Sequence, residues 1–198
     1  MDITKTPNLI PRNGHVFLQT GFLGRQEGDR MFVVLSEASS WEQRPVKIFG
    51  RKIPQPRLTS FFADEGVVYT YSGLTLQGNG WNPGLKAVKE RVESFTGEKF
   101  NSALLNLYRD GNDYMGWHRD NEKSLGDMPA VASVSLGATR VFQLREYETK
   151  KNLVSIELTH GSLLLMKGKT QGCWEHRLPK APAVTNARMN ITFRKIIL

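Results

Sequence analysis

The chain has 198 residues, of which 39% are hydrophobic and 23% are charged, the balance of a single soluble globular domain. No apolar run approaches the roughly 20 residues that a membrane-spanning helix needs, and one cysteine, Cys173, excludes an intrachain disulfide framework. The formal charge of +8 favours polyanionic partners, nucleic acid first. We expect a monomer without membrane association.

The first part of the chain predicts a strand, a helix and a hairpin. Residues 14–23 favour a strand that runs into a turn, and residues 25–42 favour a helix that Pro45 ends. Residues 46–53 favour two short strands with a turn at Gly50, which predicts a short hairpin.

A second helix begins at Asn82-Pro83-Gly84, because asparagine is a good N-cap and proline suits the first helical position. Its apolar stripe repeats at helical spacing, and Gly97 can end it.

Short strands separated by turn signals follow from Phe100 onward. They are predicted at 102–108, 115–120, 131–136, 139–145, 153–158, 162–166, 173–178 and 187–197. Many short strands after two helices predict a mostly β fold with flanking helices: a double-stranded β-helix, or jelly roll, at 100–197. We expect one domain over 1–198, with 44–76 as a nucleotide-recognition lobe.

Three side chains predict a metal site in this β-rich part. His118 and Asp120 stand two residues apart, a spacing that puts both on one face of a strand, and His176 follows 56 positions later. Two imidazoles and one carboxylate are the ligand set of non-haem Fe(II) oxygenases, which keep open positions for a cosubstrate and for O2. The other interpretation is two structural histidines and a surface aspartate.

The last strand separates apolar and polar residues. Met189, Ile191 and Phe193 form one face, and the polar residues form the other: Arg188, Asn190, Thr192 and Arg194. Two arginines on one face can hold a dicarboxylate through forked hydrogen bonds, although exposed polar faces are common in antiparallel sheets. Beside an iron site, the pair favours 2-oxoglutarate. Asn106 and Tyr108 lie on one face of an upstream strand and could hydrogen-bond the same acid.

Together these segments resemble the AlkB family of Fe(II)- and 2-oxoglutarate-dependent dioxygenases. The resemblance runs from about Val46 to Ile197 and is nearest to the branch that repairs double-stranded DNA, with the further runs 69–76 and 133–138. It implies that His118, Asp120 and His176 bind Fe(II). It also implies cosubstrate contacts for the residues Asn106, Tyr108, Arg188, Thr192 and Arg194; which arginine meets which carboxylate stays open.

The resemblance implies oxidative removal of N-methyl groups from damaged bases, with release of formaldehyde. The expected substrates are 1-methyladenine and 3-methylcytosine in DNA, preferably duplex, with the damaged base flipped out of the stack. Tyr69 and Tyr71 match the positions that cover the base, and the ring of His118 could oppose them. Glu122 suits a cationic base, while Asn121 stands where the duplex-repair branch often has a second acid.

The hairpin at 46–53 predicts a DNA contact. Phe49 stands at its tip before Gly50 and Arg51, where an aromatic side chain can fill the gap that a flipped base leaves. Arg57 follows and could touch the DNA backbone or the orphaned partner base.

Two other functions remain open from the sequence. The enzyme could act on RNA or single-stranded nucleic acid, or the chain could be a basic nucleic-acid-binding jelly roll whose metal only stabilises the fold. The expected location is the bacterial cytoplasm, with the nucleoid, or the eukaryotic nucleus.

Overall fold

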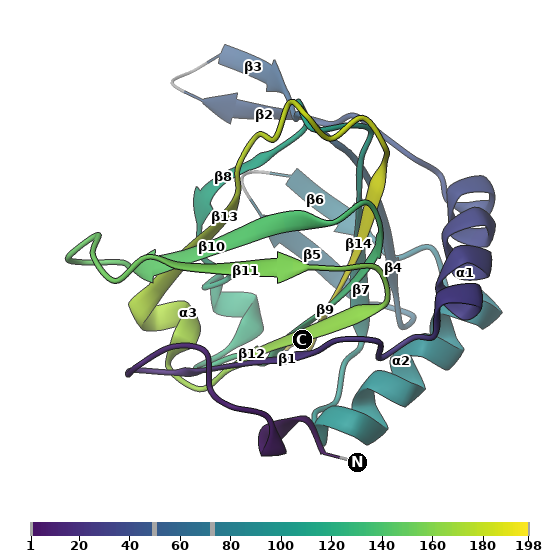
Figure 1. Cartoon of the computed structure of the whole chain (residues 1–198). Coiled ribbons are helices and arrows are strands. Elements are labelled where there is room, and N and C mark those ends of the chain that lie inside the picture. The colour runs from purple at the N-terminus through teal and green to yellow at the C-terminus, as the bar shows by residue number, and fades with distance from the viewer. Residues whose placement is uncertain (1, 49–50, 72–73, 198) are drawn as a thin grey trace.

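The protein is described by a computed structural model that covers residues 2–48, 51–71 and 74–197. Figure 1 shows its helices and strands. The helices are η1 (Ile3–Lys5), α1 (Arg25–Ala38), α2 (Pro83–Thr96), η2 (Lys123–Leu125) and α3 (Thr170–Cys173). The strands are β1 (His15–Gln19), β2 (Pro45–Ile48), β3 (Arg51–Pro54), β4 (Leu58–Ala63), β5 (Val68–Tyr71), β6 (Leu74–Gln77), β7 (Ser102–Tyr108), β8 (Met115–His118), β9 (Val131–Gly137), β10 (Arg140–Glu146), β11 (Val154–Leu158), β12 (Ser162–Lys167), β13 (Trp174–Leu178) and β14 (Arg188–Arg194).

Two antiparallel sheets form the body of the molecule. The larger has the order β1-β12-β9-β14-β7-β4, and the smaller has the order β11-β10-β13-β8. Hairpins β2–β3 and β5–β6 form two further sheets, and β2–β3 stands out from the body (Figure 1). This confirms the predicted mostly β jelly roll with flanking helices. Within the described residues, no helix is long and apolar enough to cross a membrane.

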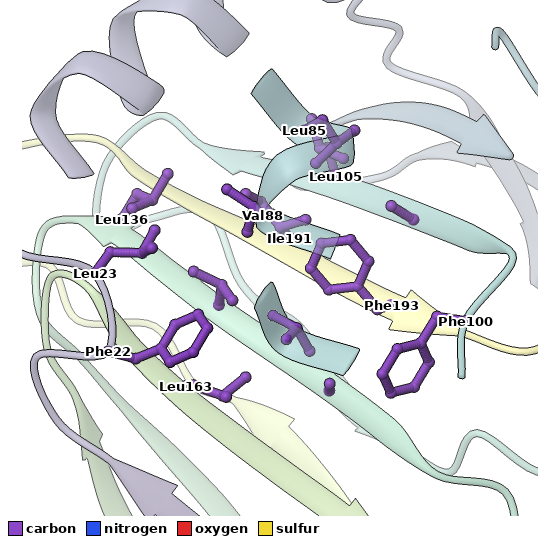
Figure 2. Packing of buried hydrophobic residues seen from close by; sticks show 14 of the residues in the cluster. Phe22, Leu23, Leu85, Val88, Phe100, Leu105, Leu136, Leu163, Ile191 and Phe193 are labelled. Carbon is purple, nitrogen blue, oxygen red and sulfur yellow. The ribbon is translucent and has the colours of Figure 1, made fainter. Parts of the chain in front are cut away.

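Helices α1 and α2 lie on the same side of the six-stranded sheet (Figure 1). Leu35 of α1 and Leu85 of α2 pack with Ile191 and Phe193 of β14 in the largest apolar cluster, part of which Figure 2 shows. Full burial of such a side chain contributes about 1.5–3 kcal/mol to folding. Helices α1 and α2 therefore pack against the predicted apolar face of β14.

A second apolar cluster lies between the two sheets. Leu164 of β12 packs there with Leu144 of β10 and Trp174 of β13. The neighbouring Leu163 and Leu165 belong to the cluster under the helices. Strand β12 is thus apolar on both faces, as expected for a strand covered on both sides.

The two main helices differ in how well their ends were predicted. Asn82 caps α2 by accepting hydrogen bonds from the backbone N–H of Gly84 and Leu85, at 2.9 and 3.4 Å, and Gly97 ends it at φ 73°. Helix α1 ends at Ala38 rather than at residue 42, because Ser39 turns to extended backbone. Glu42 instead forms a bridge to Thr59.

Within the segment 44–76, the sequence analysis missed strand β4. This strand is not part of a separate lobe: it pairs with β7, with Leu58 opposite Leu107. The remaining strands of the segment form the two hairpins, and β5–β6 covers a third apolar cluster that contains Tyr69 and Leu104.

Candidate metal and cosubstrate site

The three predicted metal ligands come together between the sheets. His118 of β8 and His176 of β13 are partners in the strand register, and their ring centroids lie 4.2 Å apart at an interplanar angle of 64°. Strand β8 ends at His118, so Asp120 lies just beyond it rather than within a strand ending at residue 120. The ligand atoms of His118, Asp120 and His176 nevertheless lie within 4.8 Å of one another.

Both imidazoles are held in the neutral form that binds metals. Nδ1 of His118 lies 2.9 Å from the backbone oxygen of Gly116; because a carbonyl only accepts, Nδ1 carries the proton and Nε2 keeps its lone pair. Burial lowers the pKa of His118. Burial and the neighbouring His118 lower the pKa of His176 to about 3.

Asp120 is held as a carboxylate. Burial alone would raise its pKa, but Arg194 and the two histidines lower it to about 2. Nη2 of Arg194 donates to Oδ2 of Asp120 at 2.9 Å, and the side-chain oxygen of Gln171 accepts from the backbone N–H of Asp120 at 3.0 Å. Such partners fix a ligand's orientation and are part of a metal site's affinity.

The polar face of β14 points into the same cavity. Its residues line the cavity together with the metal trio: Arg188, Asn190, Thr192 and Arg194. Arg188 is buried, donates to Oγ of Ser135 at 2.9 Å, and lies 5.4 Å from the ring of Tyr108. Burial lowers the pKa of Arg188 to about 10, as expected of a guanidinium without a carboxylate partner.

The residues present fit an Fe(II) ion and a dicarboxylate. Two neutral imidazoles and one carboxylate are the facial triad of non-haem iron. Among the described residues, Nδ1 of His176 and Nε of Arg188 are buried polar atoms without a hydrogen-bond partner. Such atoms in a native fold call for a ligand, ion or water.

Comparison with known proteins identifies the family. A model described as the 2OG-Fe(II) oxygenase superfamily matches residues 15–194. The chain is 40% identical over 204 residues to the alpha-ketoglutarate-dependent dioxygenase alkB homolog 3 of Rattus norvegicus, a match that covers 98% of this chain and 68% of the relative. It is 38% identical over 188 residues to the DNA oxidative demethylase ALKBH2 of Bos taurus, with 90% and 68% covered. The chain belongs to the AlkB family.

The fold agrees with this AlkB assignment. The solved structure of OsALKBH1 superposes with a TM-score of 0.66 at 19% identity, covering 96% of this chain and 100% of that chain. The AlkB-family chain is thus an Fe(II)- and 2-oxoglutarate-dependent dioxygenase that uses O2. Because the two groups of relatives differ by only two percentage points of identity, 40% against 38%, the comparison supports the family rather than one branch of it.

Two of the predicted base-binding residues face the AlkB-type cavity. Tyr69 and Glu122 both line it, and the side chain of Tyr69 interacts favourably with the Glu122 carboxylate, which opposes a rise in its pKa. Burial and the nearby Asp120 raise the pKa of Glu122. Asn121 is exposed and is not among the residues that line the cavity.

The predicted DNA contacts are only partly within the described residues. Phe49 and Gly50 lie outside them, and the side chains of Arg51 and Tyr71 are likewise not described. Arg57, which was predicted to follow the hairpin and touch the DNA backbone or the orphaned partner base, is 4% exposed and lines the cavity. Its Nε donates to Oδ1 of Asn106 at 2.7 Å. This position does not fit a contact with the DNA backbone.

The sequence analysis missed several residues that support the site. Gln171, which holds Asp120, has no pattern that would have revealed it. Ser133 and Ser135 on β9 could have been found from the sequence, because these small polar residues alternate with Ala132 and Val134, which pack under the helices. That alternation predicts a polar inner face, and Ser135 holds Arg188 on it.

Proposed function

We propose that this dioxygenase repairs DNA by oxidative demethylation of N-alkylated bases, 1-methyladenine and 3-methylcytosine, and that it prefers duplex. One observation carries the proposal. The metal trio, the two buried arginines and the Tyr69–Glu122 pair line a single cavity, so a base bound at the pair lies close to the metal. The name of the relative DNA oxidative demethylase ALKBH2 supports the same reaction.

In this proposal, Arg188 and Arg194 take opposite ends of 2-oxoglutarate. Arg194 stands beside the metal ligand Asp120 and meets the keto-acid end. Arg188, six residues before it on β14, lines the same cavity beside Tyr108 and meets the distal carboxylate with that tyrosine. Asn106 donates to the acid from Nδ2, because Arg57 occupies its Oδ1.

When bound, Fe(II) with 2-oxoglutarate and O2 supplies the oxidation of the methyl carbon. The chain's own residues select and hold the base. Tyr69, with Tyr71 and the ring of His118, supplies surfaces for stacking. The carboxyl group of Glu122 faces the positive charge that methylation places on adenine or cytosine, and Asn121, which is exposed, would contact the base from outside the cavity. A base must leave the duplex to reach this depth.

The duplex preference depends on the β2–β3 hairpin. Phe49 would fill the gap in the stack, with Gly50 and Arg51 next to it, and the net charge of +8 would hold the phosphate backbone. We further propose that the protein acts as a monomer, in the bacterial cytoplasm with the nucleoid or in the eukaryotic nucleus.

The test supplies Fe(II), 2-oxoglutarate and oligonucleotides that carry 1-methyladenine in duplex DNA, single-stranded DNA or RNA. Formaldehyde release and the mass of the base are measured. We expect one formaldehyde for each base restored, and faster turnover on duplex. Faster turnover on single strands or RNA would overturn the duplex preference, and binding without turnover would overturn the enzymatic proposal.

The Phe49→Ala variant tests the hairpin. It should depress turnover on duplex far more than on single strands, while Phe49→Leu, which keeps an apolar side chain, should retain most of the duplex rate. Equal losses on both substrates would count against a role for Phe49 in base flipping.

A further inference from the structure

Arg140, at the start of β10, is a buried arginine that the site described above does not use. It is 2% exposed and donates to three backbone oxygens: Asp110 at 3.1 Å, Asp113 at 3.0 Å and Pro179 at 2.6 Å. Asp110 and Asp113 belong to the loop after β7, and Pro179 follows β13. One guanidinium therefore ties together the loop after a cosubstrate strand and the end of a metal-ligand strand.

Burying the Arg140 guanidinium costs desolvation free energy. Burial lowers the pKa of Arg140, and its Nε is buried without a hydrogen-bond partner among the described residues. Within that part of the chain, neither Arg140 nor Arg188 forms an ion pair, whereas Arg194 is paired with Asp120. Removing a guanidinium from water costs free energy that its remaining interactions must offset. For Arg140 these interactions are the three backbone hydrogen bonds and the nearby carboxylates of Asp113 and Asp110.

Both of these arginines, Arg140 and Arg188, lie near the ring of Tyr108. The guanidinium of Arg140 lies 6.0 Å from the ring centroid of Tyr108, and that of Arg188 lies 5.4 Å from the same centroid. Among the described residues, this end of the site thus carries two buried guanidiniums outside any ion pair. The charge of Arg140 is partly balanced by the nearby carboxylates of Asp113 and Asp110, whereas Asp120 pairs directly with Arg194 at the metal end. Both guanidiniums therefore contribute to the positive electrostatic potential where an anion would bind to Tyr108 and Arg188.

We propose that Arg140 is a positioning residue for the distal carboxylate of 2-oxoglutarate. It holds the loop beside Tyr108 closed and adds a second positive charge behind the ring, so that the site selects a keto diacid over a keto monoacid. This inference rests on the proposed placement of the distal carboxylate at Arg188 and Tyr108.

The test measures binding rather than turnover. Dissociation constants for 2-oxoglutarate and for 2-oxobutyrate, a keto acid without the distal carboxylate, are determined by calorimetry on the full chain with Mn(II) and without O2. We expect Arg140→Met to weaken 2-oxoglutarate binding by about tenfold or more, the scale of a lost interaction with a charged group. Binding of 2-oxobutyrate should change less than about twofold.

Arg91→Met is the matched control, because Arg91 also joins two elements, through Glu27 and the backbone oxygen of Phe22, but lies away from the cavity. It should leave the preference for the diacid unchanged. Equal weakening of both acids in Arg140→Met, or no change for either, would overturn the inference. If Arg140→Met does not fold, the Arg140→Lys variant is tested instead. Lysine keeps the positive charge but not the forked hydrogen bonds of a guanidinium, so this variant should lose part of the preference for the diacid over the monoacid. An unchanged preference would refute the role of Arg140. A wild-type protein that shows no preference for the diacid would refute the placement at Arg188 instead.

Discussion

Arg57 fixes the orientation of the Asn106 amide, since its Nε donates to Oδ1 of Asn106 at 2.7 Å. An arginine can only donate, so the amide oxygen must face Arg57. Nδ2 donates one long hydrogen bond, 3.5 Å, to the backbone oxygen of Leu104, and its second N–H can donate to another acceptor. An acidic cosubstrate needs a donor at this position, because an amide oxygen turned toward a carboxylate would repel it. The pair therefore prepares one residue of β7 for anion binding.

The Arg57→Met variant should raise the KM for 2-oxoglutarate by roughly tenfold, because it leaves the buried Asn106 oxygen unsatisfied and free to turn. Titration of 2-oxoglutarate at a saturating oligonucleotide concentration measures this. Arg44→Met is the control, since Arg44 pairs with Glu42 at the surface and should leave that KM unchanged. A weaker affinity for the oligonucleotide alone would instead support the DNA contact first predicted for Arg57.

Asp120→Asn should damage both metal binding and the metal-free fold. Because the change of a residue that merely supports a ligand costs 10–100-fold in metal affinity, loss of a ligand carboxylate should weaken Mn(II) binding by at least about 100-fold. It also leaves the Arg194 charge buried without a counter-ion, which should lower the free energy of unfolding by about 3 kcal/mol. Urea unfolding without metal measures the second effect.

Asp113→Asn provides the comparison for the stability measurement. Asp113 is equally buried, but its partner Arg109 has a side chain that is 49% exposed and can turn to water. We expect a smaller loss than for Asp120→Asn. A larger loss would mean that the Arg194–Asp120 pair contributes little to the metal-free fold.

Glu146 should make stability depend on acid pH. Arg12, Thr149 and Asn152 donate to its carboxylate, and these hydrogen bonds, that of Arg12 first, lower its pKa to about 2 from the ordinary 4.5. A lowered folded-state pKa means that the carboxylate stabilises the fold above pH 4.5, and that this contribution is lost as the pH falls toward 2. Unfolding measured between pH 2 and 6 should show a shallower acid loss in Glu146→Gln. Glu148→Gln, in the exposed part of the same turn, should keep the wild-type profile.

Gly111 should tolerate no side chain. A Cβ at this position would lie 1.7 Å from the backbone oxygen of Ala181, and the two residues are already joined by a backbone hydrogen bond of 2.8 Å. Gly111→Ala should push the loop after β7 away from the segment before β14, lower the melting temperature and weaken 2-oxoglutarate binding. Gly80→Ala, where nothing lies within 4 Å, should change neither quantity.

The predictable part of the site depended on local patterns. The alternation along β14 predicted which residues pack under the helices and which face the cavity, because side chains alternate along any strand. The spacing of His118 and Asp120 predicted one shared face, although Asp120 follows the strand. Their meeting with His176 depends on the register between β8 and β13, which no local pattern contains.

The missed strand explains the wrong position of Arg57. In β4, Thr59 to Ala63 are all buried, so the alternation that marks a half-exposed strand is absent. Leu58 pairs with Leu107, which brings Arg57 beside the end of β7 and its cosubstrate residues. Without β4, the sequence left Arg57 on the hairpin lobe.

Strand β14 carries hydrocarbon on one side and ion-binding groups on the other, and it pairs with β7 and β9 at every position from Arg188 to Phe193. A slip of one residue would reverse the two sides, burying both guanidiniums among phenylalanines and offering methionine and isoleucine to the iron. Correct folding of this central strand and acquisition of a working catalytic centre are consequently a single event, and a one-residue insertion inside the strand would abolish both together.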